Sequence, residues 1–256
     1  MCLILFAFRQ RDDYPLVVIA NRDEYYARPT QDAEWWTDGG IYAGRDLEAG
    51  GTWLGVNRRG RFAAVTNVRE PGGMQAGERS RGELTRTFLE GDEAAEDYLA
   101  GLADRDHQYS GFNLLIGDHH ALWFYSNRER HIQRIEPGTY GISNGRFDEP
   151  WPKLKSARQA LASQLVDGID HDRLLRILTD SEIAEDHELP DTGISLEFER
   201  LLSSRFIRSP GYGTRACSVL SFSPDGHIAF TERNYRNIDD SGETHFEAFL
   251  AQPISP

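Results

Sequence analysis

The sequence predicts an α+β fold built in layers rather than a doubly wound parallel sheet. Apolar runs of strand length gather at the start, in the middle and near the end of the chain. Stretches with helical spacing of apolar residues fill the two intervals between them. The 256 residues contain no internal repeat, low-complexity tract or linker-like segment. We therefore expect a single domain over residues 1–256, with a core large enough to be stable without disulfides.

The first part of the chain alternates strands with tight turns and then becomes helical. Short apolar runs bounded by polar or glycine-rich turns predict strands at Cys2–Phe8, Leu16–Ala20, Trp53–Val56 and Phe62–Thr66. The segment 70–77 is rich in proline and glycine and predicts a loop. Ser80 and Glu83 have the spacing of a capping box that opens a helix through Leu89. A second helix is expected over Glu93–Ala103.

The second part repeats this order of strands, helices and strands. Strands are predicted at Phe112–Gly117, Ala121–Ser126, Ile132–Ile135 and Tyr140–Ser143. A long helix is expected to begin at Trp151-Pro152, and a shorter one covers Arg173–Leu178. An acidic loop is expected over 185–193. The closing strands are Cys217–Phe222 and Ile228–Thr231, and the segment His245–Leu250 fits a strand or a helix.

Composition excludes several classes of protein. The chain has 28 Lys+Arg against 41 Asp+Glu, so its formal charge of −13 argues against a nucleic-acid binder. The first apolar run is too short to cross a bilayer, which takes about 20 residues, and lacks the basic start of a signal peptide. Two cysteines, Cys2 and Cys217, cannot form a disulfide framework. We expect a cytoplasmic protein without integral membrane association, and the oligomeric state is left open.

Cys2 directly follows the initiator methionine. Removal of Met1, which is usual before a small second residue, would place a thiol and an α-amine on the same residue. The amine titrates near pKa ~8 and can serve as the base for its own thiol. The alternative is that Cys2 is a small buried hydrophobic residue at the start of a strand.

Polar residues follow three of the predicted strands. Asn21, Asn67 and Asn144 stand where apolar runs stop, and Asp23 lies close behind Asn21. Asparagine amides can stabilise an oxyanion, although asparagine is also a common turn residue. Arg22 and Arg28 would clamp a carboxylate or phosphate, or form salt bridges with nearby acidic residues. No histidine or cysteine spacing matches a zinc site, so no metal is expected.

The segment Asn21-Arg22-Asp23-Glu24 resembles the signature of the NRDE family, which takes its name from that tetrapeptide. The eukaryotic members of the family are the transport and Golgi organisation protein 2 homologues. Similar blocks run along the whole chain at Met1-Cys2, 50–56, 63–67, 81–84, 111–114, 137–144, 210–215 and 230–233. The family is similar to the N-terminal nucleophile hydrolases, above all to the cysteine branch with choloylglycine hydrolase and penicillin V acylase. This resemblance implies a four-layer αββα sandwich.

The resemblance also implies roles for individual residues. Cys2 matches the nucleophile, Asp23 the aspartate that contacts the nucleophile's amine, and Asn67 and Asn144 the oxyanion-binding and substrate-orienting asparagines. The arginine that precedes this aspartate in bile-salt enzymes is replaced by Ala20. A later arginine would be supplied by Arg215 or Arg205. The residues expected to bind substrate are therefore Asn21, Arg22, Glu24, Arg28 and Arg215.

Two functions follow from this interpretation. In the first, the protein hydrolyses a non-peptide amide (C–N) or related acyl bond, with Cys2 as the nucleophile and without a required cofactor. In the second, the same pocket holds a ligand without turnover, and the protein binds or moves haem, acyl-CoA or a lipid. Cys2 would then be a candidate thiolate ligand of haem. Both predict a small hydrophobic or anionic partner, and the sequence leaves open whether the protein is an enzyme.

Overall fold

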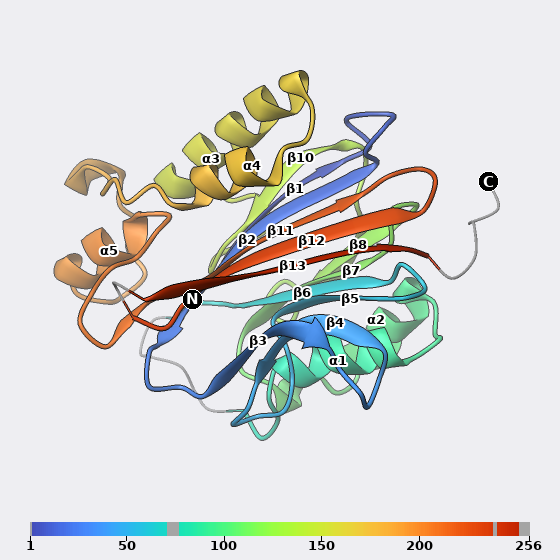
Figure 1. Ribbon diagram of the computed structural model, residues 1–256. Helices are drawn as coiled ribbons and strands as arrows, with labels where there is room; N and C mark the ends of the chain where they lie inside the picture. The colour runs from blue at the N-terminus through green and yellow to red at the C-terminus, as the bar shows by residue number, and fades with distance from the viewer. Residues whose placement is uncertain (1, 71–76, 238–239, 251–256) are drawn as a thin grey trace.

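Two antiparallel sheets packed face to face form the centre of the molecule. The computed structural model describes residues 2–70, 77–237 and 240–250. Helices cover the outer face of each sheet, so the layers run helix, sheet, sheet, helix (Figure 1). The prediction of an α+β, four-layer αββα sandwich is confirmed. The predicted loop at 70–77 falls largely on residues 71–76, which lie outside the described residues.

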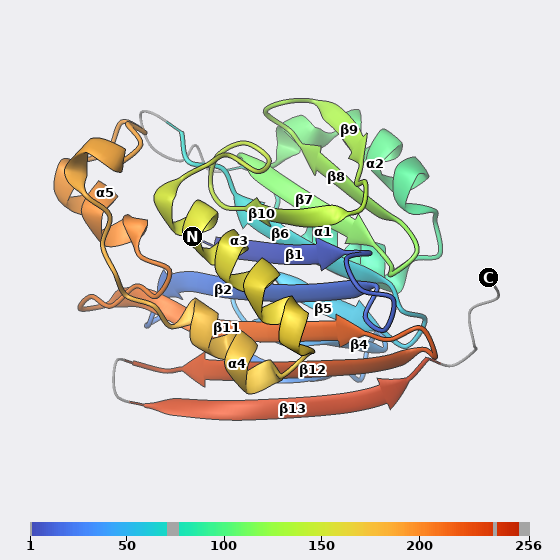
Figure 2. The same ribbon diagram turned by 90° about the horizontal axis from the view of Figure 1, so that it is seen from above.

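Sheet A, the six-stranded sheet, carries the start of the chain in its interior. In spatial order its strands are β10 (Gly138–Ile142), β1 (Cys2–Phe8), β2 (Leu16–Tyr25), β11 (Tyr212–Phe222), β12 (His227–Tyr235) and β13 (Ser241–Phe249) (Figure 2). β1 pairs with a neighbour on each side from Ile4 to Phe8, and its first residue pairs with β2. The register places Cys2 opposite Arg22 of β2.

Sheet B, the seven-stranded sheet, follows the order of the chain. Its strands are β3 (Thr30–Trp35), β4 (Ile41–Asp46), β5 (Leu54–Asn57), β6 (Phe62–Asn67), β7 (Phe112–Gly117), β8 (Leu122–Ser126) and β9 (His131–Arg134). Each strand is antiparallel to the next, so the sheet is a meander.

The helices lie on the outer faces of the sheets. Helices α1 (Gly82–Glu90) and α2 (Ala95–Ala103) cover sheet B, while α3 (Pro152–Gln164) and α4 (His171–Leu178) cover sheet A (Figure 1). Helix α5 (Leu196–Ser203) lies near the first turn of α3, and short 3₁₀ turns occur at Asp106–Gln108, Leu165–Asp167 and Asp186–Glu188. No helix in the described part of the chain is long and apolar enough to cross a membrane.

The alternation of β1 explains where Cys2 points. Ile4, Phe6 and Phe8 pack into the core between the two sheets. Leu3, Leu5 and Ala7 pack into the core beneath α3 and α4. Successive side chains of a strand point to opposite faces, so the continuous apolar run reflects burial on both faces. By the same parity, Cys2 shares the inter-sheet face with Ile4.

The polar segment after the second apolar run lies within a strand. The prediction ended this strand at Ala20, but β2 continues to Tyr25. Asn21 and Arg22 pair with β11, and a register shift between Thr214 and Ala216 interrupts the ladder next to Asp23. These buried polar residues have hydrogen-bond partners in β11, in β3 of the facing sheet and in the helical layer.

Other local predictions differ from the structure in specific ways. The capping box is wrong: Arg81 occupies the N-cap position of α1 and no side chain caps the helix. The reason is that the backbone of Arg81 is already helical, and Glu83 pairs with Arg79 instead. Strands β3 and β4 and helix α5 were not predicted. The undecided segment at 245–250 belongs mostly to strand β13.

Candidate active site

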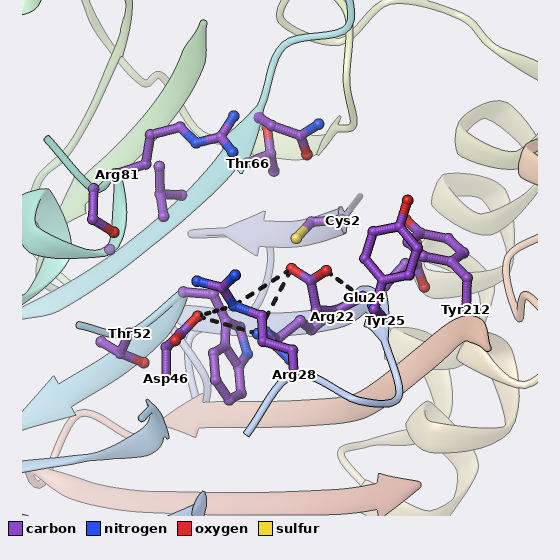
Figure 3. Close-up of a pocket in the computed structure, with 16 residues that line it drawn as sticks. Cys2, Arg22, Glu24, Tyr25, Arg28, Asp46, Thr52, Thr66, Arg81 and Tyr212 are labelled. Atoms are coloured by element: carbon purple, nitrogen blue, oxygen red, sulfur yellow. Dashed lines mark hydrogen bonds and ion pairs between the residues drawn. The ribbon is translucent and has the colours of Figure 1, made fainter. Parts of the chain in front are cut away.

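Cys2 opens into a cavity of about 430 Å³ at the start of β1, between the two sheets. Three other predicted residues from β2 line it, namely Arg22, Asp23 and Glu24, and Asn67 lines it from the end of β6. Figure 3 shows the sulfur between two groups of side chains, with Arg81 and Thr66 on one side and Glu24, Arg22 and Arg28 on the other. The fold therefore brings Cys2, Asp23 and Asn67 to one cavity.

The thiol of Cys2 is subject to opposing influences. Burial raises its pKa, whereas the Arg22 cation and a hydrogen bond from the backbone N–H of Asp23 favour the thiolate. Arg81, near the start of α1, is a cation that sequence reasoning did not place in the site. Burial lowers the pKa of Arg81, and the charges of Cys2 and Glu24 oppose this shift. The sequence marked Arg81 only as part of a matching block, without a role.

Two arginines of the predicted clamp share one carboxylate. Arg22 lies over the ring of Trp53, 4.5 Å from its centroid, and its Nη2 is 3.4 Å from Asp46 Oδ2. Arg28 donates from Nε to the same oxygen at 2.6 Å. Burial alone would raise the pKa of Asp46, but the hydrogen bond from Arg28 and the charges of both arginines keep it below its ordinary value. The dashed contacts in Figure 3 trace this network, which also reaches Glu24.

Asp23 is a buried carboxylate with two supporting residues. Its Oδ1 accepts a hydrogen bond from Thr214 Oγ1 at 2.7 Å. Burial raises its pKa, and the ammonium group of Lys153 opposes that shift. Lys153 is itself buried, donates from Nζ to the carbonyl of Leu202 at 2.9 Å, and has a pKa lowered by burial to about 8. Sequence reasoning missed Lys153, because a lysine in the first turn of a helix gives no sign of burial.

Asn144 lies behind Asn67 and outside the lining of the cavity. Its Nδ2 donates to both the backbone carbonyl and Oδ1 of Asn67, at 2.9 Å and 2.8 Å. Because Oδ1 of Asn67 is occupied in this way, the Nδ2 group of Asn67 is the donor that remains for the cavity. Asn144 is fully buried. Its position suits a residue that orients Asn67, so the two asparagines do not stand side by side at the cavity.

Two residues of the predicted substrate-binding set lie away from Cys2. Asn21 turns toward the helical layer, where its Nδ2 donates to the carbonyls of Leu178 and Arg205 at 2.9 Å and 2.8 Å. Arg215 donates to backbone carbonyls and lines a neighbouring cavity. Parity explains Asn21, because it is next to Arg22 on β2 and faces the opposite side of the sheet, whereas Arg215 is the extra residue at the register shift between Thr214 and Ala216.

We expect Asn21→Ala to destabilise the fold by about 2 to 3 kcal/mol, because it leaves two buried carbonyls without their donor. Urea unfolding would measure the loss. A residue that only contacts substrate would show no such loss, so an unchanged free energy of unfolding would contradict this structural role.

The architecture matches proteins with an N-terminal nucleophile. A mutant of conjugated bile acid hydrolase from Clostridium perfringens superposes with a TM-score of 0.55 at 10% identity, covering 95% of this chain and 92% of that one. A Caenorhabditis elegans orthologue of N-acylethanolamine-hydrolyzing acid amidase superposes with a TM-score of 0.51 at 11% identity, covering 86% and 92%. The fold, with Cys2 at the start of an interior strand, is that of the N-terminal nucleophile hydrolases.

The chain belongs to the family described as Transport and Golgi organisation 2, whose model matches residues 1–237. The human Transport and Golgi organization protein 2 homolog is 36% identical over 276 residues, covering 98% of this chain and 100% of the relative. The Bos taurus homolog is 36% identical over 266 residues, covering 93% and 95%. The Drosophila melanogaster protein is 26% identical over 282 residues, covering 96% and 98%.

Proposed function

We propose that the protein hydrolyses a non-peptide amide or related acyl bond, with Cys2 as the nucleophile. The observation that carries this proposal is the presence of Cys2, Asp23 and Asn67 at one cavity. A thiol, a buried carboxylate and an amide donor are the groups that acyl transfer from an N-terminal residue requires.

The proposed reaction begins after removal of Met1. The α-amine of Cys2 accepts the thiol proton, and the sulfur attacks the carbonyl carbon of the substrate. The carbonyl oxygen becomes an oxyanion and accepts a hydrogen bond from Nδ2 of Asn67. When the C–N bond breaks, the proton held by the amine passes to the leaving amine, and a thioester remains on Cys2. Water then attacks the thioester with the α-amine as base, which releases the acid and restores the thiol.

Charged side chains around the sulfur favour a polar substrate. Arg22, Arg28 and Arg81 line the cavity together with Glu24 and Asp46. An acyl donor with an anionic group close to the scissile bond would pair with these guanidinium groups. A wholly apolar substrate would remove water from these charged side chains without offering them any new polar contact.

Labelling of the intact protein with a cysteine-directed acyl probe tests the proposal. We expect mass spectrometry to show loss of Met1 and one added acyl group on Cys2. Cys217 is fully buried, and burial raises the pKa of its thiol, so Cys217→Ser is the matched control and should label normally. Retention of Met1, or equal labelling of Cys2→Ser, would refute the mechanism.

A second candidate function is the binding of haem or of an acyl-CoA or other lipid without turnover. It is favoured by the three arginines at the cavity, which suit acidic ligand groups. Titration with haem, read by absorbance, and with acyl-CoA, read by calorimetry, would test it. Binding that weakens in Arg22→Gln supports this function; if neither ligand binds, it fails.

We expect Lys153→Met to move the acid limb of the pH profile for Cys2 acylation to higher pH. The ammonium of Lys153 favours the charged form of Asp23, so its removal raises the pKa of that carboxyl. Near neutral pH, fewer molecules would then have the ionised Asp23 carboxylate that is proposed to contact the α-amine of Cys2. At each pH, the rate of Cys2 acylation should be divided by the concentration of folded protein. Lys155→Met, an exposed change on the same helix, should leave it unmoved.

A further inference from the structure

A buried ion pair joins helix α5 to the segment that follows β6. Nη1 of Arg69 donates to Oε2 of Glu199 at 2.7 Å, and the two side chains are only 9% and 5% exposed. The Arg69 guanidinium also lies 5.2 Å from the centroid of the Trp151 ring. Burial lowers the pKa of Arg69, and the charge of Glu199 opposes that shift. Breaking such a pair is costly, because the remaining charge stays buried without its counter-charge.

The second carboxylate oxygen of Glu199 is fixed by Thr192. Oε1 of Glu199 accepts a hydrogen bond from the backbone N–H of Thr192 at 3.0 Å and another from the hydroxyl of the same residue. Nη1 of Arg69 donates to that hydroxyl as well, at 3.1 Å. The void beside the ion pair is only about 10 Å³. The close packing and the shared hydrogen bonds therefore leave the Arg69 side chain little freedom to move.

Arg69 lies next to the residue that orients the proposed oxyanion donor. Strand β6 ends at Asn67, so Arg69 is beyond the strand. The backbone N–H of Arg69 donates to the carbonyl of Asn144 at 2.7 Å, and the side chain of Asn144 donates to Asn67. These contacts form a continuous path from Glu199 to the amide at the Cys2 cavity. Neither Glu199 nor Arg69 is among the described residues that line this cavity.

Helix α5 also supports the buried carboxylate of the site. Leu202 lies three residues after Glu199 and therefore on the same side of the helix. Its carbonyl accepts a hydrogen bond from Nζ of Lys153 at 2.9 Å, and the Lys153 ammonium favours the charged form of Asp23. One side of a short helix thus contacts the supports of both Asn67 and Asp23.

We propose that Glu199 is a positioning residue for the oxyanion donor and acts through Arg69 and Asn144. By fixing the Arg69 side chain, Glu199 keeps the Arg69 N–H against the Asn144 carbonyl. Asn144 in turn keeps the amide of Asn67 directed into the Cys2 cavity. A displacement of about 1 Å in a catalytic group can cost about 10²-fold in rate, so a small shift is enough to matter. This assignment rests on the proposed hydrolysis, because it concerns the rate of Cys2 acylation.

The kinetics of Cys2 acylation in Glu199→Gln test this assignment. The rate is measured against the concentration of the acyl probe and divided by the concentration of folded protein. We expect the maximal rate to fall about tenfold, less than the 10²–10³-fold cost of removing an oxyanion donor, because Asn67 is still present. The half-saturating probe concentration should not change. Glu199→Asp keeps the carboxylate and should recover part of the rate. An unchanged maximal rate, or a loss confined to probe binding, overturns the assignment.

The Asn67→Ala background separates positioning from a general disturbance of the fold. In that background Glu199→Gln should cause no further slowing, because the donor that Glu199 positions is gone. An equal loss of rate in both backgrounds would mean that Glu199 does not act through Asn67, which overturns the proposal. Asp186→Asn is the matched control. It breaks an exposed ion pair with Arg200 on the same helix and should leave acylation unchanged.

A second variant covers the case in which Glu199→Gln does not fold. The double replacement Arg69→Leu with Glu199→Leu removes both charges, so no buried charge is left without a partner, and the same rates are expected of it. If the wild type is not acylated at Cys2, the hydrolase fails and this assignment fails with it. If the wild type is acylated and the Glu199 variants match its rate, the hydrolase stands and the assignment alone is refuted.

Discussion

Replacing Asn67 by alanine is expected to slow acylation of Cys2 by about 10²–10³-fold, the usual cost of removing one oxyanion donor. Asn67 is only partly buried at the end of β6, so the fold should survive the change. The rate of acyl-probe labelling, measured beside a thermal unfolding curve, gives the result. An Asn67→Ala protein that labels at the wild-type rate would remove Asn67 from the mechanism.

Asn144 provides the matched comparison, because it reaches the cavity only through Asn67. Asn144→Ala should slow acylation less than Asn67→Ala does, and it should also reduce stability, since Asn144 is fully buried. In the double variant, loss of Asn144 should add no further slowing to that of Asn67→Ala. Additive effects would mean that Asn144 contacts the reacting group directly.

Replacing Glu232 by glutamine is expected to stabilise the protein at alkaline pH. Glu232 is fully buried on β12, and its two oxygens accept hydrogen bonds from Ser218 Oγ at 2.8 Å and from the backbone N–H of Ala33 at 3.1 Å. The second bond joins sheet A to strand β3 of sheet B. Burial raises the pKa of this carboxyl from 4.5 to about 7.

The direction of the pH dependence follows from proton uptake. Below the ordinary pKa, the carboxyl is protonated in the folded and unfolded states alike. As pH rises from there to about 7, the unfolded chain loses the proton while the folded chain keeps it, so stability falls. A shift of this size corresponds to about 3 kcal/mol. From acid to alkaline pH, the free energy of unfolding of the wild type should therefore fall by about this amount more than that of Glu232→Gln.

Urea unfolding at about pH 5 and about pH 8 measures the Glu232 effect. Glu197→Gln, on an exposed face of α5, is the control and should follow the wild type at both values. If the difference between wild type and Glu232→Gln is the same at both pH values, Glu232 does not hold a proton in the folded state.

Elements buried on both faces were predictable, and edge elements were not. The strand at Cys2–Phe8 has the predicted bounds because its side chains are apolar on both faces. Strand β3 lies at the edge of sheet B, and only Ala33 among its six residues is fully buried, so it has no apolar run. Strand β13 is also an edge strand, and its exposure alternates along its length. Its short apolar tail therefore fitted a helix equally well.

The site was predictable in part for a related reason. Polar residues at the ends of apolar runs marked Asp23 and Asn67, because the side chains of a strand change from apolar to polar where the strand leaves the core and reaches a cavity. The contact between Asn67 and Asn144 spans 77 residues of sequence, and no local pattern specifies it. Lys153 and Arg81 come from helices whose docking onto the sheets decides what their side chains meet.

The positions of the strands along the sequence determine the order in which the two sheets can form during synthesis. Sheet B uses a continuous stretch from Thr30 to Arg134 and can form while later residues are still on the ribosome. Sheet A cannot, because β2 pairs with β11, which begins only at Tyr212. The edge of β2 thus stays unpaired until translation is nearly complete. If Met1 is removed as proposed, this delay would give an aminopeptidase time to act before pairing with β11 completes the sheet around Cys2.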